Sequence, residues 1–226
     1  MTKSKKCCIC GYEFTMDDKV AKEPLIQPFG DGAKYYYNLW HFDVEKCPKC
    51  GYSSKDISKT LHKKIINDEQ YQSISKTDLL VELDSARPNR IGAYLESAYY
   101  YESVGETLNN IKSLLQAGDL MYAELMYWDE YIFDSSDSVN ALISKSQYNE
   151  IKKFADYLYN TAMDKLEAYT KENPEDIDSL LLFGGSLCDG NKIQNIKGAK
   201  ILNNLKSMDL SIDQKKALKF LIEGLS

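Results

Sequence analysis

Two short segments with the same residue pattern constrain the fold of this chain more than any other feature. Residues 7–12 read C-C-I-C-G-Y and residues 47–52 read C-P-K-C-G-Y, so C-x-x-C-G-Y occurs twice. A two-residue gap lets both thiolates of a pair reach one ion, and the Gly that follows can adopt the positive φ of a tight turn. Two such turns supply the four thiolates of a closed tetrahedral site. We therefore predict one structural metal site, with the ligands Cys7, Cys10, Cys47 and Cys50.

The other potential ligands fit this site less well. Cys8 lies inside the first turn, but the gap from Cys8 to Cys10 is wrong for a ligand pair. Cys188 belongs to the apolar run 180–188 and is expected to be a small buried side chain. The only histidines are His41 and His62. His41, six residues before the second pair, could support or replace a ligand, but four thiolates already complete the set.

The expected ion is Zn²⁺, with iron as the alternative, because both accept a tetrahedral set of thiolates. Residues 7–14 and 47–51 resemble the two iron-binding turns of rubredoxin. That resemblance implies an iron site that transfers electrons. Rubredoxin, however, is complete without the long region that follows the second pair here, so a structural zinc site is the preferred interpretation.

The region around the two pairs predicts a small β module of the zinc-ribbon or rubredoxin-like kind. A module of about 50 residues has little core, so a bound metal is expected to hold it together. We expect this metal-binding module over residues 1–55, a linker with a helix over 56–88, and a helical domain over 89–226. Pro and Gly punctuate the apolar content of the module, which consists of Phe14, Val20, Leu25, Ile26, Phe29, Tyr35, Tyr36, Tyr37, Trp40 and Phe42.

Beyond residue 56 the apolar residues follow a helical period. Ile91, Tyr94, Leu95 and Ala98 fall on one face of a helix, and residues 151–169 repeat this spacing. The fold class is therefore α+β and mostly α.

Local signals indicate where these helices begin and end. Asn173-Pro174-Glu175-Asp176 reads as an N-cap, a first-position Pro and an acidic first turn, and Ser211 with Gln214 reads as a capping box. Breaks are predicted at Gly105, at Gly118, over residues 134–138 and around Gly190–Asn191, which gives seven or eight helices.

Short turns between the helices favour antiparallel hairpins, as in tetratricopeptide repeats. Tyr94, Ala98, Tyr101, Gly105, Leu114 and Ala117 fit the repeat pattern, and residues 173–191 resemble the start of another repeat. The two matches are 86 residues apart, which is not a multiple of the roughly 34-residue period. We expect a tetratricopeptide-like or irregular antiparallel helical array.

The order of these parts resembles an uncharacterised bacterial family classed as a domain of unknown function. The resemblance rests on the two Cys pairs, the aromatic stretch 35–44 before the second pair, and Arg87–Pro88 opening tetratricopeptide-like helices. Members commonly have Pro after the first Cys, where this chain has Cys8. The resemblance implies metal binding and a helical scaffold, with no established activity.

Charge separates the two parts and bears on partners. Residues 1–64 carry 12 Lys and 8 acidic residues, whereas the remainder carries 16 basic and 26 acidic residues. The acidic helical part argues against wrapping of nucleic acid and favours another protein as partner, with the chain's 17 tyrosines as candidate anchors. Nucleic-acid binding by the first part remains the alternative, through Lys3, Lys5, Lys6, Lys46, Lys49, Lys55, Lys59, Lys63 and Lys64.

No catalytic constellation is apparent, and we expect the protein not to be an enzyme. The chain has two histidines, no phosphate-binding loop of the G-x-x-x-x-G-K-[ST] type, and a metal site without an open position. The basic start leads into a Cys pair instead of an apolar stretch, and no apolar run approaches the roughly 20 residues that span a bilayer. A cytoplasmic protein without membrane contact is expected.

Overall fold

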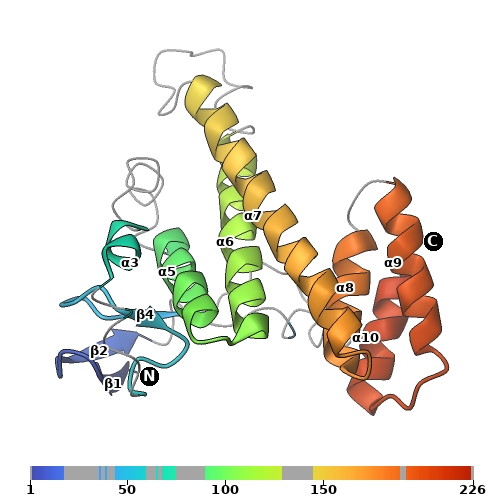
Figure 1. Ribbon diagram of the computed structural model, residues 1–226, viewed down its shortest axis with the longest axis horizontal. Coiled ribbons are helices and arrows are strands. Elements are labelled where there is room, and N and C mark those ends of the chain that lie inside the picture. Colours follow the sequence, from blue (N-terminus) through green and yellow to red (C-terminus); the bar gives the residue numbers. More distant parts are fainter. Residues whose placement is uncertain are drawn as a thin grey trace. The chain divides into compact units, whose positions relative to one another are not determined.

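The computed structural model describes residues 2–17, 36, 39, 44–59, 65, 68–74, 90–128, 145–188 and 192–224. These residues are mostly helical with a few short antiparallel strands (Figure 1), which confirms the expected α+β, mostly α class. The chain packs into two compact units. The first comprises Met1–Ala21 and Asp43–Ala162, and the second comprises Lys22–Phe42 and Met163–Ser226.

Two β-hairpins in the first unit each enclose one Cys pair. Strand β1 (Thr2–Lys6) pairs with β2 (Glu13–Asp17), and β3 (Glu45–Lys46) pairs with β4 (Ser53–Ser54). Because the strands flank each pair, the two cysteines of a pair lie in the connecting turn. The residues expected to form a β layer between the pairs lie largely outside the described part of the chain, and the zinc-ribbon character stays a prediction.

The helices of the first unit are α3 (Glu69–Ile74), α5 (Arg90–Ser103), α6 (Thr107–Trp128) and the first part of α7 (Lys145–Glu172). The predicted apolar face of α5 is confirmed, since Ile91, Tyr94, Leu95 and Ala98 are all buried. The predicted break at Gly105 is also confirmed: Gly105 has φ +75° and lies in the turn after α5. This turn lets α5 and α6 pack side by side (Figure 1).

The predicted break at Gly118 is wrong, because α6 runs through this residue to Trp128. A single Gly inside a helix costs only about 1 kcal/mol relative to Ala. Tertiary packing outweighs that cost here. A Cβ at Gly118 would lie 3.8 Å from the carbonyl oxygen of Ala155 and 3.9 Å from Cβ of Leu158, so α7 packs on α6 at this point.

The second unit contains the end of α7 with α8 (Ile177–Cys188), α9 (Lys192–Leu205) and α10 (Ile212–Glu223). Helices α8 and α9 approach closely, since a Cβ at Gly198 would lie 2.6 Å from the carbonyl oxygen of Gly184. The core of this unit consists of Leu39, Leu181, Leu202, Leu205, Leu210, Ala217 and Leu218. Cys188 packs against this core as expected, but it is half-buried and not fully buried.

Two of the helix signals in this region are confirmed and one needs correction. Helix α7 covers the whole periodic segment 151–169, and Ser211 with Gln214 forms the predicted capping box of α10. At α8, however, the capping side chain belongs to Asp176 and not to Asn173. The Asp176 carboxylate accepts the backbone N–H of Ser179 at 3.2 Å, so the helix starts three residues later than predicted.

Tyr36 also packs elsewhere than expected. The sequence placed it in the small β module, but its ring lies against α8, where a Cβ at Gly185 would be 2.6 Å from it, and it packs against the core of the second unit. The predicted breaks at 134–138 and 190–191, the Arg87–Pro88 start, His41 and His62 lie outside the described residues. Within the described part, no helix is long and apolar enough to cross a membrane.

Candidate metal centre

The first Cys turn, residues 7–12, is called here the first knuckle. The N–H of Cys7 donates to the carbonyl oxygen of Tyr12 at 2.9 Å, and the N–H of Gly11 donates to the carbonyl oxygen of Cys7 at 2.9 Å. Gly11 has φ +71°, a left-handed conformation that favours glycine. These features close the turn so that both thiols of the pair face the same side.

The second knuckle, residues 47–52, repeats this geometry. Cys47 donates to the carbonyl oxygen of Tyr52 at 2.8 Å, Gly51 donates to that of Cys47 at 2.9 Å, and Gly51 has φ +74°. The C-x-x-C-G-Y pattern thus specifies one local structure twice.

The two knuckles bring the four predicted ligands together. Sγ of Cys7 lies 3.7 Å from Sγ of Cys50, and Sγ of Cys10 lies 3.7 Å from Sγ of Cys47. All four sulfur atoms lie within 4.8 Å of one another. A disulfide needs about 2.05 Å, whereas a tetrahedral ion with bonds of about 2.3 Å requires sulfur atoms about 3.8 Å apart. The spacing fits ligands around one ion, so the cluster can hold a metal.

Backbone N–H groups point at the sulfur atoms. Cys7 accepts from the N–H groups of Ile9 and Cys10, and Cys10 accepts from that of Tyr12. Burial raises the pKa of Cys7, although the two hydrogen bonds that its sulfur accepts from backbone N–H groups act to lower it. Burial also acts to raise the pKa of Cys10, but the N–H of Tyr12 and the neighbouring thiols lower it on balance. These amides are placed to stabilise thiolates once a cation supplies the opposing charge.

The second pair has the same kind of donor. Burial raises the pKa of Cys50 far above its ordinary value, although the N–H of Tyr52 donates to its sulfur and acts in the opposite direction. Metal binding at this cluster must therefore displace protons from buried thiols.

Exposure differs within each pair. Cys7 and Cys47 are buried, whereas Cys50 is half-buried and Cys10 is exposed. Cys8 is not part of the cluster, as predicted from its spacing. Its backbone N–H instead donates to the carbonyl oxygen of Ile57 at 2.9 Å, which joins the first knuckle to the chain after the second.

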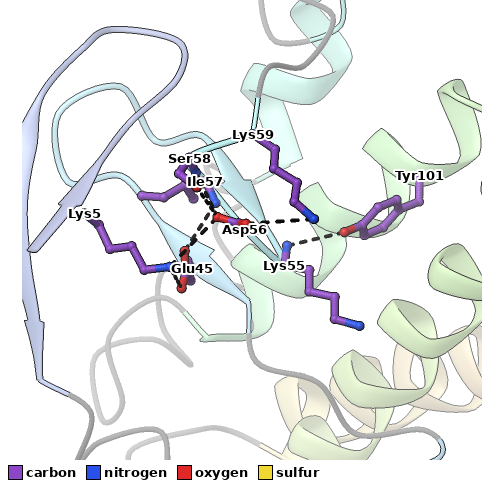
Figure 2. Close-up of polar contacts among 8 residues, drawn as sticks. All are labelled: Lys5, Glu45, Lys55, Asp56, Ile57, Ser58, Lys59 and Tyr101. Carbon is purple, nitrogen blue, oxygen red and sulfur yellow. Dashed lines mark hydrogen bonds and ion pairs between the residues drawn. The ribbon is translucent and has the colours of Figure 1, made fainter. Parts of the chain in front are cut away.

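A polar cluster strengthens this junction (Figure 2). Nζ of Lys5 on β1 lies 2.9 Å from Oε1 of Glu45 on β3, and Oε2 of Glu45 accepts the N–H of Ile57 at 3.2 Å. The Asp56 carboxylate accepts from the Ser58 hydroxyl at 2.6 Å. That hydrogen bond, with Lys5 and Lys59 nearby, lowers the pKa of Asp56. The cluster fixes the two hairpins to one another.

Helix α5 supports the second knuckle through a buried carboxylate. Glu96, whose side chain is 3% exposed, accepts from Oγ of Ser53 at 2.5 Å and lies 3.4 Å from Nζ of Lys46. Tyr71 of α3 also contributes, because its hydroxyl accepts the N–H of Ser53 at 2.9 Å. The residues flanking the second Cys pair are therefore held by two helices.

Aromatic packing completes this contact. Tyr52 is fully buried and meets the ring of Tyr100 edge-on, with centroids 6.3 Å apart. The hydroxyl of Tyr101 accepts the N–H of Lys55 at 3.4 Å (Figure 2). Tyr100 and Tyr101, considered as partner anchors from the sequence, are thus used within the chain.

The support from Glu96 was missed by the sequence reasoning. The local pattern gave no signal for it, because Glu96 follows Leu95 directly and so lies roughly 100° around α5 from that residue of the predicted apolar face. Several of the Lys residues considered for nucleic acid have acidic neighbours instead. These pairs are Lys5 with Glu45, Lys6 with Glu13, Lys46 with Glu96, and Lys59 with Asp56.

Comparison with known proteins adds no family to this geometry: no family model, curated protein or solved structure matches the chain.

Proposed function

We propose that this protein is an interaction scaffold in which Zn²⁺, bound by Cys7, Cys10, Cys47 and Cys50, is a structural ion. The observation that carries the proposal is the mutual approach of the four sulfur atoms within 4.8 Å. Four thiolates fill a tetrahedral shell, so the ion has no open position for a substrate or a reactive water. Its role is to join the two hairpins.

The surroundings of the cluster support a structural role. The hairpins contribute only short strands, and the second one is fixed to α5 through Ser53, Glu96 and Tyr52. A small module of this kind gains folding free energy from metal binding. The ion thereby holds the first knuckle to a scaffold of helices, which offers surfaces to another protein.

Metal analysis of protein purified from cells tests the proposal. We expect a colourless protein with one zinc per chain, and Co²⁺ substitution should give the intense absorption of tetrahedral thiolate coordination. A red protein with one iron would favour the rubredoxin-like electron carrier. Absence of any stoichiometric metal would contradict both.

Cysteine variants make the test specific. Cys47→Ser should lose the metal, whereas Cys8→Ser and Cys188→Ser are matched controls that should retain it, because neither residue lies in the cluster. Loss of metal in Cys8→Ser would mean that the first pair binds in a different register.

A further inference from the structure

The four thiols of the cluster differ in their access to solvent. Cys7 and Cys47 are buried, and Cys50 is half-buried. Cys10, in contrast, is exposed, and the turn beside it is open: a Cβ at Gly11 would meet no atom beyond its chain neighbours within 4 Å. Oxidation of cysteine follows thiolate character and access. In the zinc-loaded chain all four would be thiolates, so access distinguishes them, and Cys10 is the sulfur that a dissolved oxidant reaches first.

The sulfur atoms also approach one another across the two knuckles. Sγ of Cys10 lies 3.7 Å from Sγ of Cys47, and Sγ of Cys7 lies 3.7 Å from Sγ of Cys50. Each of these contacts joins the first knuckle to the second. A disulfide needs about 2.05 Å, so closing either contact shortens it by roughly 1.7 Å. A thiolate of one knuckle is therefore within reach of an oxidised sulfur of the other.

Contacts that use no ligand side chain hold the two knuckles together. The N–H of Cys8 donates to the carbonyl oxygen of Ile57 at 2.9 Å. Nζ of Lys5 lies 2.9 Å from Oε1 of Glu45, whose Oε2 accepts the N–H of Ile57 at 3.2 Å (Figure 2). These contacts do not depend on any one thiolate, so they remain when the first sulfur is oxidised. They keep the knuckles close for a second, intramolecular step.

We propose that Cys10 is the oxidation site of the metal centre and that Cys47 resolves it, so that a disulfide between the two knuckles replaces the ion. The oxidant is hydrogen peroxide. The inference rests on the proposed function, because the zinc ion is what holds the sulfur atoms as thiolates. The oxidised chain loses its metal but keeps its two hairpins joined.

The chemistry takes two steps. The Cys10 thiolate attacks one oxygen of hydrogen peroxide, the O–O bond breaks, and a sulfenic acid forms as hydroxide leaves. The Cys47 thiolate then attacks the Cys10 sulfur, the S–O bond breaks, and a second hydroxide leaves as the S–S bond forms. Two thiolates thus give two electrons to one peroxide. Only Cys7 and Cys50 remain as ligands, which is too few to retain the ion. A dithiol reductant reverses the bond by exchange.

Peptide mapping identifies the disulfide, because trypsin cuts the second knuckle between its cysteines. Cleavage after Lys46 and Lys49 puts Cys47 on residues 47–49 and Cys50 on residues 50–55, while the first knuckle stays on residues 7–19. The zinc-loaded full chain is treated with one equivalent of hydrogen peroxide, its remaining thiols are alkylated, and the digest is analysed by mass spectrometry. We expect residues 7–19 to be linked to residues 47–49.

Other connectivities contradict the proposal. A bond between residues 47–49 and 50–55, or one confined to residues 7–19, shows oxidation within a knuckle. A bond from residues 7–19 to residues 50–55 alone excludes Cys47 as the resolving residue. Cys8→Ser is the control for the first knuckle, because Cys8 lies on the same peptide but outside the cluster. The expected link should form in this variant, and its loss would assign the oxidation to Cys8.

Histidine variants test which sulfur is attacked, since zinc also accepts three Cys and one His. Cys10→His removes the exposed thiolate, and Cys50→His removes the half-buried one at the same position of the other knuckle. A chromogenic chelator follows zinc release under peroxide. We expect release to be at least about tenfold slower in Cys10→His than in Cys50→His. Equal rates, or slower release in Cys50→His, overturn the proposal.

Zinc content before oxidation separates the two possible failures. A chain that carries zinc but forms no bond between the knuckles contradicts this inference alone, whereas a chain without zinc contradicts the proposed function. If a histidine variant does not bind zinc, the connectivity in the unaltered chain decides the outcome.

Discussion

The two knuckles have the same backbone and opposite surroundings. Both close with matching hydrogen bonds and a left-handed Gly, yet Tyr52 is fully buried and Tyr12 is 42% exposed. The difference comes from α5, which covers the second knuckle with Glu96 and Tyr100. The comparison teaches that the motif specifies the turn and the placement of its thiols, while packing decides whether the tyrosine that ends each turn is buried.

Metal removal should produce the largest difference between the two knuckles, in the protection of their backbone amides. With a chelator, we expect the amides of Cys7 and Gly11 to exchange with solvent almost as in an unfolded chain, because the proposed ion would be the main support of the first knuckle. The amides of Cys47 and Gly51 should keep at least about tenfold more protection, which corresponds to about 1.4 kcal/mol, since α5 still holds that turn. Hydrogen exchange measured by NMR checks this, and equal loss in both turns would show that α5 gives no independent support.

Truncation of the two tyrosines should give the next largest difference. Tyr52→Ala removes a buried ring and is expected to cost about 3–5 kcal/mol. Tyr12→Ala removes an exposed ring and should cost less than about 1 kcal/mol. Thermal unfolding of the zinc-loaded variants measures both.

The conservative substitution Tyr52→Phe separates ring packing from the hydroxyl. Among the described residues the Tyr52 hydroxyl makes no well-formed hydrogen bond, although the Ser54 side chain is near enough to oppose the burial that raises the Tyr52 pKa. Its removal should therefore cost little, because no buried bond is lost. A large loss of stability with Tyr52→Phe would show that the hydroxyl, and not the ring, holds the second knuckle in place.

Removal of the acidic partner of Lys46 should also cost more stability than removal of the acidic partner of Lys6. Glu96→Ala leaves Lys46 and the Ser53 hydroxyl without a buried carboxylate and should cost about 2–3 kcal/mol. Glu13→Ala removes an exposed pair with Lys6 and should cost less than about 1 kcal/mol. Denaturant unfolding compares the two variants, and similar costs would mean that burial at α5 does not strengthen the contact.

The smallest effect is expected at Asp56, which links the two hairpins. Hydrogen bonding to Ser58 and the nearby Lys5 and Lys59 lower its pKa below the ordinary 3.8. A lowered pKa means that the folded state favours the charged form, so this stabilisation is present at neutral pH and is lost as pH falls through the lowered value. The side chain is 32% exposed, so Asp56→Asn should cost less than about 1 kcal/mol at pH 7. A double-mutant cycle with Ser58→Ala checks the origin, and additive costs would contradict it.

The cluster of four cysteines was predictable from the sequence because its determinants are local. Two residues between cysteines and one Gly after them define each turn, and the same positive φ occurs at Gly11 and Gly51. Periodicity likewise predicted α5 and α7. The capping box at Ser211 depended on residues three positions apart and was also found.

The errors arose where distant packing decides. Gly118 reads as a break but lies inside α6, because α7 packs there. Tyr36 reads as part of the β module but packs in the second unit. Glu96 and Lys46 are 50 residues apart, so no local pattern joins them. Nothing within the two copies of C-x-x-C-G-Y distinguishes the tyrosine that becomes buried.

Relatives of this chain should tolerate substitution at some of its glycines and not at others. At Gly11 and Gly51 a Cβ would meet nothing within 4 Å, so only the left-handed backbone opposes substitution. That cost is roughly 1–2 kcal/mol for most residues and smaller for Asn or Asp, which relatives can therefore carry at these positions. At Gly198 a Cβ would lie 2.6 Å from a carbonyl oxygen of α8. Diverged sequences should therefore vary at Gly11 and Gly51 but retain Gly198, unless α8 and α9 move apart.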